Sequence, residues 1–386
     1  MSFPDESHWR NFRTKMPVSE KWAYFDHAAV APLPQPSAEK MAAWCHQAAL
    51  EGDTVWLEWE KATEETRNLA AQLIGATPQE IALVHNTTHG INLVAEGLPW
   101  REGDNLVVLA NEFPSNLYPW LNQQGKGVDV RIIPVDGVAP DLNRIAEACD
   151  NRTRLLTVSW VNYKTGWRLD PAALAHIAHA AGALFFLDAI QGLGVFPLDV
   201  RAADIDFLAA DGHKWMLGPE GAGIFYIKRE LLDILHPVGI GWNSVTDRKN
   251  FDRTDLTFRD SAARYEGGSQ NMVGMIGFGA SLKLLRECGV GPQESDIGQR
   301  VLQVTDWTCA ALAKAGAEVL SNRQGEERSG IIAFTLPGKS PQAVRAAGQR
   351  LGVNFSVRGE WIRLSPHAYN DQSDIERLLE TLASVD

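Results

Sequence analysis

Short apolar segments alternate with helix-like segments between residues 80 and 230. The apolar segments are rich in Val, Ile, Leu and Phe and lack a polar alternation, which is typical of parallel strands covered by helices on both faces. One segment between them predicts a helix that begins at Pro171, behind Asp170, and stops at Gly182. We predict a mostly parallel sheet of seven strands, at residues 81–86, 105–111, 130–135, 154–161, 183–189, 206–211 and 221–227.

The pattern changes after residue 270, where long helical segments replace the regular alternation. Such a mixture of helices and strands indicates a smaller α+β domain. We therefore predict a large domain over residues 18–270 and a small domain over residues 271–386, joined by residues 1–17. Within the small domain we expect helices at 272–289, 298–316 and 372–385, a strand at 330–338 and a strand pair at 353–366.

Composition and charge narrow the class of protein. The 386 residues are 45% hydrophobic, enough for two domains with sizeable cores. The formal net charge of −12 disfavours nucleic acids and anionic membranes as partners. The N-terminal segment lacks the apolar core of a signal peptide, and no apolar run reaches membrane length. The cysteines form no CxxC pair, which argues against a metal site of that kind and favours a cytoplasmic location.

Polar residues follow the predicted strands at the edge where open α/β sheets bind ligands. Thr87, Thr88 and His89 follow the first strand and precede a helix. Hydroxyls and free backbone N–H groups at a helix N-terminus favour an anion, and phosphate is a common one. Capping of the helix by Thr87 or Thr88 is the alternative. Phe113 follows the second strand, where it either stacks on a flat ring or belongs to the core.

Two charged residues interrupt the apolar sequence later in the sheet. Asp188 ends the most apolar strand, and Lys214 follows the next strand. A buried carboxylate needs a partner, and a protonated pyridine nitrogen would suit it; a helix cap is the alternative. A lysine amine desolvated in a pocket has a lowered pKa and becomes a nucleophile toward carbonyls, whereas a surface lysine on a hairpin does not. With the anion site and the aromatic ring, these residues describe a site for pyridoxal 5′-phosphate (PLP).

Several longer stretches resemble the class V aminotransferase family. They are YFDHAAVAPLP near the start, TTHGINLVAEGL, NEFPSNLYPW, LDAIQ, GHKW, RYEGGSQN and IRLSPHAYN. This family is a fold-type I group of PLP enzymes that includes cysteine desulfurases, isopenicillin N epimerase, cystine C–S lyases and kynureninase. The resemblance covers nearly the whole chain. It implies the α/β fold of PLP-dependent transferases of fold type I, with a large domain and a smaller C-terminal α+β domain.

The resemblance also implies a role for each matching residue. Lys214 corresponds to the Schiff-base lysine that shuttles the Cα proton, and Asp188 corresponds to the partner of the pyridine nitrogen. Arg363, with Arg358 as a second candidate, matches the arginine that binds the substrate α-carboxylate, a partner that suits its planar guanidinium. The other cofactor ligands implied are Phe113 stacked on the ring, Gln191 at the ring 3-oxygen, and Thr87, Thr88, His89, His213 and Ser269 around the phosphate.

Ser269 matches a residue that reaches the phosphate of a neighbouring subunit. The resemblance therefore implies a homodimer with shared active sites. Asp211 departs from the desulfurases, which have a phosphate-binding serine at its position. Because a carboxylate repels a phosphate dianion, we expect Asp211 to point away from the phosphate, toward His213 or a backbone N–H.

The segment before Arg363 departs from the desulfurases as well. Those enzymes carry a catalytic cysteine between the segments that match SVRG and IRLSPH, whereas here only Glu360 and Trp361 separate them. Phe113 stands where the desulfurases have a histidine that stacks on the ring. Persulfide formation on the enzyme requires a thiolate nucleophile. We therefore expect that the chain is not a persulfide-forming cysteine desulfurase.

The expected reaction removes the Cα proton of a small amino-acid substrate held by its carboxylate. Transamination or epimerisation is favoured, with cysteine or cystine β-elimination and kynureninase-like hydrolysis as alternatives. A PLP-binding protein without activity is disfavoured because both Lys214 and Arg363 are present. A nucleotide-dependent Rossmann enzyme is disfavoured because no GxGxxG follows the first strands. The sequence leaves the substrate side chain and the choice among these reactions open.

Overall fold

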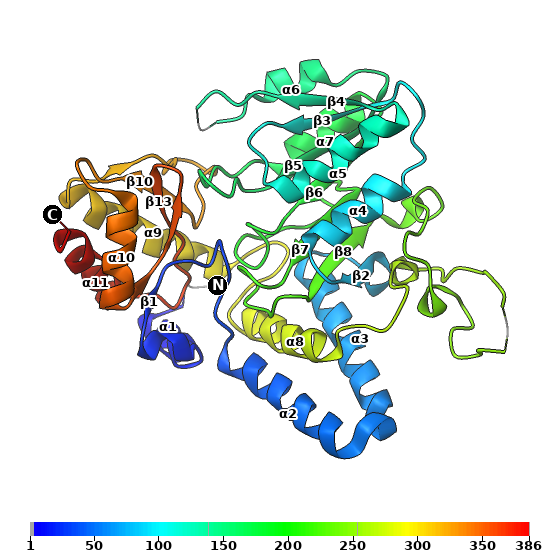
Figure 1. Ribbon diagram of the computed structural model, residues 1–386, viewed down its shortest axis with the longest axis horizontal. Coiled ribbons are helices and arrows are strands. Elements are labelled where there is room, and N and C mark those ends of the chain that lie inside the picture. Colours follow the sequence, from blue (N-terminus) through cyan, green and yellow to red (C-terminus); the bar gives the residue numbers. More distant parts are fainter. Residues whose placement is uncertain (1–3, 138, 253, 386) are drawn as a thin grey trace.

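The computed structural model describes residues 4–137, 139–252 and 254–385. Figure 1 shows a larger part built around a central sheet and a smaller part that carries the C-terminus. Two hydrophobic cores flank the central sheet, and a third fills the smaller part. The chain therefore folds around separate cores. The division at residues 17 and 270 stays a prediction, although α8 (Met272–Glu287) packs with the larger part and β1 (Ala23–Tyr24) pairs with the smaller one.

The larger part is built on a seven-stranded sheet with the order β2-β8-β7-β6-β5-β3-β4. Strand β8 runs antiparallel to both of its neighbours, and the remaining pairs are parallel. This confirms the predicted mostly parallel sheet. The strands are β2 (Ile81–Val84), β3 (Asn105–Leu109), β4 (Asp129–Ile133), β5 (Thr153–Ser159), β6 (Leu184–Asp188), β7 (Phe207–Asp211) and β8 (Gly223–Ile227).

Helices cover both faces of this sheet because its central strands are apolar on both sides. In β6, Phe185 and Leu187 enter one core while Phe186 enters the other, as the twofold period of a strand requires. Helices α4 and α7 pack on the sheet, and α8 packs against α2 and α3 (Figure 1). The helices of this part are α2 (Gln35–Glu51), α3 (Trp56–Leu73), α4 (Thr87–Gly97), α5 (Tyr118–Leu121), α6 (Leu142–Ala148), α7 (Pro171–Ala180) and α8 (Met272–Glu287).

Helix α7 confirms the local signals that were used to predict it. Its first residue is Pro171, and the Asp170 side chain caps it by accepting a hydrogen bond from the Ala172 N–H at 3.0 Å. The chain leaves the helix through Gly182, whose φ of +77° is costly for other residues. Capping and glycine chemistry thus set the bounds of this crossover helix, which delivers the chain to β6.

The smaller part contains a four-stranded sheet with the order β12-β13-β10-β9. The N-terminal segment joins it, because β1 (Ala23–Tyr24) pairs in parallel with β11 and Arg13 of α1 forms an ion pair with Asp374 at 2.7 Å. Its elements are α1 (Glu6–Thr14), α9 (Asp296–Lys314), α10 (Pro341–Leu351), α11 (Gln372–Ala383), β9 (Glu318–Val319), β10 (Ile332–Thr335), β11 (Val353–Asn354), β12 (Ser356–Arg358) and β13 (Trp361–Leu364).

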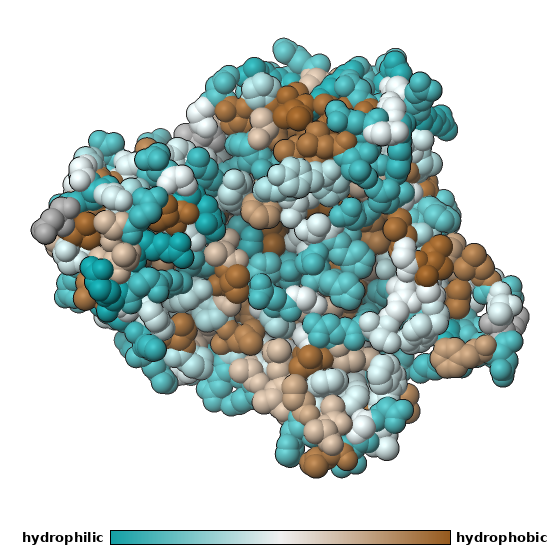
Figure 2. All heavy atoms as spheres, viewed as in Figure 1, coloured by the Kyte–Doolittle hydropathy of each residue, from teal (hydrophilic) through white to brown (hydrophobic). Residues whose placement is uncertain are grey.

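The outer surface in the view of Figure 2 is mostly hydrophilic, with scattered apolar side chains. In the described part of the chain, no helix combines the length and the apolar character needed to cross a bilayer.

Candidate active site

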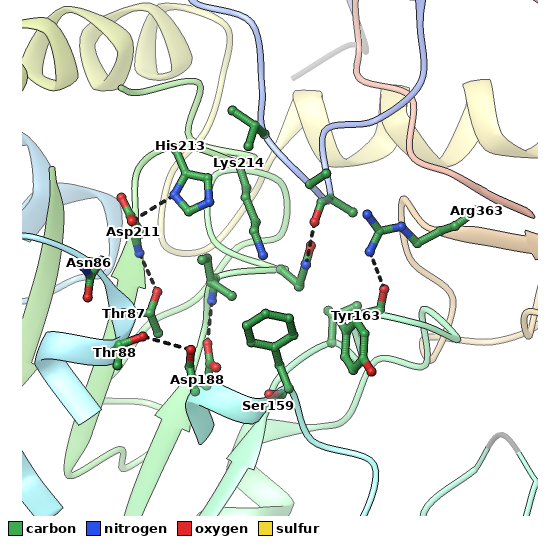
Figure 3. Close-up of a pocket in the computed structure, with 18 of the residues that line it drawn as sticks. Asn86, Thr87, Thr88, Ser159, Tyr163, Asp188, Asp211, His213, Lys214 and Arg363 are labelled. Atoms are coloured by element: carbon green, nitrogen blue, oxygen red, sulfur yellow. Dashed lines mark hydrogen bonds and ion pairs between the residues drawn. The ribbon is translucent and has the colours of Figure 1, made fainter. Parts of the chain in front are cut away.

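A cavity of about 280 Å³ lies at the carboxyl ends of β5, β6 and β7. The N-terminus of α4, the loop after β1 and the β12–β13 hairpin close its sides (Figure 3). This is the edge where an open α/β sheet binds ligands. The structure brings together here nine of the residues predicted from the sequence: Thr87, Thr88, Phe113, Asp188, Gln191, His213, Lys214, Arg358 and Arg363.

The N-terminus of α4 forms one end of the cavity. Asn86 caps the helix, because its side-chain oxygen accepts from the His89 N–H at 2.8 Å. Capping by Thr87 or Thr88, the alternative reading of the sequence, therefore does not occur. Thr87 Oγ1 accepts from the Asp211 N–H at 2.9 Å, and Thr88 Oγ1 donates to Ser115 Oγ at 2.9 Å (Figure 3). Two hydroxyls and the positive end of a helix dipole thus face the same space, which suits an anion.

Two of the predicted phosphate ligands lie outside the residues that line this cavity. The His89 ring stacks on His85 with 5.2 Å between ring centroids, and its backbone N–H is engaged by the helix cap. Ser269 lines a separate cavity together with Trp242 and Arg248. The single chain therefore holds neither residue at the candidate anion site, and the role of Ser269 toward a second subunit stays a prediction.

Asp211 is paired with His213 at the anion end of the cavity. The Asp211 Oδ2 and His213 Nδ1 atoms lie 2.9 Å apart, and Asp211 is only 4% exposed. The expectation that Asp211 turns toward His213 is confirmed. This contact places the imidazole at the cavity wall directly beside the buried carboxylate.

Asp188 ends β6 with its carboxylate at the floor of the cavity. It is 3% exposed, and its Oδ1 accepts from the Ile190 N–H at 3.1 Å. Burial raises the pKa of Asp188 to about 6, and the nearby Lys214 acts in the opposite direction. A carboxylate in such a dry place is stabilised by a cationic N–H donor, so it suits a protonated ring nitrogen.

Lys214 follows β7, and its amine lies in the cavity rather than on the surface. The residue is 9% exposed, and burial lowers the pKa of its amine to about 8 against the opposing charge of Asp188. The turn that carries it is tight: the Gly212 N–H donates to Ala222 O at 2.8 Å, and a Cβ at position 212 would lie 2.7 Å from that oxygen. Glycine is therefore required two residues before the lysine. The tight turn holds a partly neutral amine near Asp188.

Phe113 and Gln191 flank the space around the lysine. The Lys214 Nζ lies 5.7 Å from the centroid of the Phe113 ring, which is 44% exposed and so does not belong to the core. The Gln191 amide is fixed at both ends, because Nε2 donates to Ala28 O at 3.0 Å and Oε1 accepts from Trp215 Nε1 at 2.8 Å. One amide hydrogen of Gln191 remains for a ligand oxygen.

Arg363 brings its guanidinium from β13 into the side of the cavity opposite the anion end (Figure 3). It is 1% exposed, with Nη1 donating to Tyr163 O at 2.7 Å and Nη2 lying 3.3 Å from Asp26 Oδ1. Its Nε has no hydrogen-bond partner among the described residues. Burial and the charge of Arg358 lower the pKa of Arg363 to about 10. This guanidinium retains capacity for an anionic ligand.

Sequence reasoning missed three polar residues of this region: Asp26, Ser159 and Glu112. Asp26 pairs with Arg363 and accepts from Ser356 Oγ, and Ser159 lines the cavity beside Asp188. Glu112 accepts from the Ser159 N–H at 2.7 Å. All three lie in stretches that the sequence had already marked: Asp26 in YFDHAAVAPLP, Glu112 in NEFPSNLYPW and Ser159 in the predicted strand 154–161. The sequence motifs could therefore have pointed to them. Their partners, however, lie on other strands.

An anion cradle, a buried amine and a buried carboxylate in one cavity define the class of protein as a PLP enzyme of fold type I. The chain belongs to the class V aminotransferase family, whose model matches residues 23–378. Pyridoxal phosphate is accordingly its cofactor, and the groups that line the cavity suit it. The Asp188 carboxylate suits a protonated ring nitrogen, the hydroxyls at the N-terminus of α4 suit a phosphate, and the exposed face of Phe113 suits a flat ring.

Three known proteins illustrate the similarity. A probable cysteine desulfurase of Methanothermobacter thermautotrophicus is 31% identical over 97% of this chain and 97% of its own. The apo structure of a cysteine desulfurase from Thermococcus onnurineus has a TM-score of 0.86 at 27% identity, covering 98% of this chain and 97% of that one. A mutant of C-DES with glycine covalently linked to its PLP cofactor shares the fold, with a TM-score of 0.89 at 22% identity over 99% and 100% of the two chains.

These comparisons overturn the functional expectation drawn from the sequence. We expected a transaminase or epimerase, with C–S β-elimination or kynureninase-like hydrolysis as alternatives, and not a persulfide-forming cysteine desulfurase. Relatives over most of the chain nevertheless carry the name cysteine desulfurase. The expectation rested on the missing cysteine between Arg358 and Arg363. That absence removes one acceptor for sulfur, whereas cleavage of the C–S bond depends on the amine, the carboxylate and the cofactor. The inference from a missing acceptor to a missing activity was wrong.

Proposed function

We propose that this protein is a PLP-dependent enzyme that removes sulfur from L-cysteine. The observation that carries the proposal is that Lys214, Asp188 and Arg363 share one cavity in a chain whose relatives are named for this activity. An amine, a carboxylate and a guanidinium in that arrangement suit a substrate with an amino group and an α-carboxylate. The role of each residue is part of this proposal.

The bound cofactor supplies an aldehyde for the substrate amine and a ring that accepts electrons from Cα. Arg363 binds the α-carboxylate through the N–H groups that Tyr163 and Asp26 leave free, and these two partners hold its plane in position. Lys214 takes the proton at Cα, because burial keeps a useful fraction of its amine neutral near neutral pH. The Asp188 carboxylate stabilises the positive charge on the protonated ring nitrogen.

The sulfur acceptor in this proposal is a thiol from another molecule. Among the described residues, those that line the cavity include no cysteine, and Cys45, Cys149, Cys288 and Cys309 lie elsewhere in the fold. The reaction balances as L-cysteine plus a thiol giving L-alanine plus a persulfide. The Cβ–S bond breaks, an S–S bond forms to the acceptor, and the hydrogen of the acceptor thiol ends on Cβ.

Assembly and location are proposed on separate grounds. A homodimer is supported by Ser269, which lies outside the candidate active site of its own chain, in a separate cavity lined by Trp242 and Arg248. A cytoplasmic location is supported by the four cysteines, all of which are free thiols, as a reducing compartment maintains.

The experiment incubates the holoenzyme with L-cysteine and an added thiol, and measures L-alanine, persulfide and pyruvate. We expect L-alanine and persulfide in equal amounts, and no L-alanine from Lys214→Ala. Lys283→Ala, on the exposed side of α8, is the matched control and should behave as wild type. A variant with all four cysteines replaced by serine should keep its L-alanine yield. Pyruvate in place of L-alanine would refute the proposal.

A further inference from the structure

Gln191 presents a side-chain amide to the candidate active site, and the two ends of an amide have opposite chemistry. Gln191 lines the cavity and is 3% exposed. Its Nε2 donates hydrogen bonds through two hydrogens, whereas its Oε1 only accepts them. What Gln191 offers to a ligand therefore depends on which end of the amide faces the cavity, and the residue type alone leaves this open.

Two contacts of opposite chemistry fix the Gln191 amide. The indole Nε1 of Trp215, which is only a donor, donates to Gln191 Oε1 at 2.8 Å. The backbone oxygen of Ala28, which is only an acceptor, receives a hydrogen bond from Gln191 Nε2 at 3.0 Å. A turned amide would set oxygen against oxygen at Ala28 and N–H against N–H at Trp215. The neighbours of Gln191 therefore determine its orientation, and one hydrogen of Nε2 remains for a ligand.

Trp215 is itself held in a closely packed place. It directly follows Lys214 in the chain and is 1% exposed. A Cβ at Gly330 would lie 2.5 Å from Cη2 of the indole, and the His367 ring stacks on the indole with 6.0 Å between ring centroids. Gly330 precedes β10 and His367 follows β13, so the smaller part of the fold packs against this indole. The indole N–H is thus a fixed donor.

The remaining N–H of Gln191 suits the cofactor of this family. In PLP the ring hydroxyl oxygen stands next to the carbon that carries the aldehyde, and the aldehyde is the group that a lysine amine attacks. Gln191 and Lys214 line one cavity, and Trp215, the residue after the lysine, joins the two through its bond to Gln191. An N–H donor in this place stabilises negative charge on the ring oxygen, whereas an amide oxygen would oppose it.

We propose that Trp215 is a positioning residue whose indole N–H holds the Gln191 amide with an N–H toward the cofactor, where it keeps the ring oxygen anionic. Without the indole N–H, Gln191 Oε1 becomes a buried acceptor without a partner, which is costly. The amide then turns its oxygen toward the polar cavity, and the cofactor loses a donor. This role concerns the bound cofactor and does not depend on the reaction proposed above.

The first test titrates the holoenzyme without substrate. The absorbance of the bound cofactor follows the proton that it shares with the nitrogen of Lys214, and a donor at the ring oxygen lowers the pH at which this proton leaves. Trp215→Phe keeps an aromatic ring but removes the N–H, so the titration midpoint should rise by about one pH unit. An unchanged midpoint in Trp215→Phe would overturn the proposal.

Trp100→Phe is the matched control for this titration. The Trp100 indole also donates a hydrogen bond, to Ala95 O at 2.7 Å. Trp100 follows the C-terminus of α4, whereas the cavity lies at the N-terminus of that helix. The midpoint of Trp100→Phe should therefore equal that of the wild type.

A double-mutant cycle separates positioning from packing. Gln191→Leu removes the amide and should raise the midpoint by about as much as Trp215→Phe does. If Trp215 acts through Gln191, the variant that carries both substitutions has the midpoint of Gln191→Leu alone. A second rise of the same size in the double variant would show that the indole acts independently of Gln191, which refutes the proposal.

Nuclear magnetic resonance tests the contact itself and needs no Trp215 variant, in case Trp215→Phe does not fold. Holoenzyme labelled with 15N in its 13 tryptophans gives one indole N–H signal for each. Because the Trp215 indole donates to Gln191, Gln191→Leu should shift one of these signals upfield and leave the others in place. No shifted signal would contradict the hydrogen bond. A holoenzyme that makes no L-alanine would refute the proposed function instead, and neither the titration nor the resonance uses L-cysteine.

Discussion

In the role proposed for Lys214, its ammonium group must lose a proton before the amine can attack the cofactor aldehyde, and burial of the amine shifts the pH at which this happens. Burial lowers the pKa of the amine from 10.5 to about 8. Only the neutral amine attacks an aldehyde, so the rate of uptake follows the neutral fraction. At pH 7 that fraction is about one in ten, whereas an amine with the ordinary pKa would have about one in 3,000, so burial accelerates uptake roughly 300-fold.

The assay follows cofactor absorbance in a stopped-flow instrument after apoenzyme is mixed with PLP at a series of pH values. The rate should rise about tenfold per pH unit below pH 7 and level off above about pH 8. Repeating the series with pyridoxal, which lacks the phosphate, separates the titration of the amine from that of the ligand. Lys283→Ala should match wild type. A rate that keeps rising tenfold per unit to about pH 10 would refute the argument from burial.

Three further predictions concern charged groups. Arg363→Lys should raise KM for L-cysteine about 10- to 100-fold with a smaller change in kcat, because a point charge replaces a planar fork; an unchanged KM speaks against carboxylate binding. Arg67→Ala strips a buried glutamate of its partner, so urea unfolding should show a loss of about 3–5 kcal/mol, against less than about 1 kcal/mol for the exposed control Lys126→Ala. Asp211→Asn should weaken PLP binding about 10-fold by dialysis, because His213 loses its anionic partner; equal binding contradicts this pairing.

Much of the fold followed from the sequence because the signals were local. All seven strands of the central sheet coincide with apolar segments, and the capping of α7 by Asp170 was visible in a four-residue stretch. The ends of the strands could be predicted as well. The sequence therefore placed Thr88, Asp188 and Lys214 at one edge of the sheet, where the structure has them in one cavity. These predictions succeeded because parallel strands bring their carboxyl ends to one edge of the sheet.

Other features depended on contacts between distant segments. Asp26 lies 3.3 Å from Arg363 although nearly the whole chain separates them, and Glu112 meets Ser159 only because β3 and β5 are neighbours in the sheet. His89 has the right place in the sequence for the anion site, but its ring stacks on His85 instead. Neither partner nor orientation can be inferred from a residue type, since both depend on the packing of other elements.

The sequence by itself determined the class of this protein: a mostly parallel α/β sheet, a lysine and a carboxylate at its strand ends, and a short hairpin before Arg363. Only the tertiary structure decided the protonation of these groups. A pKa depends on burial and on the charges nearby, so Lys214 at about 8 and Glu112 at about 7 arise from neighbours that the fold supplies. The residue types determine which reactions are possible, and packing determines the pKa of each group and therefore whether it is protonated.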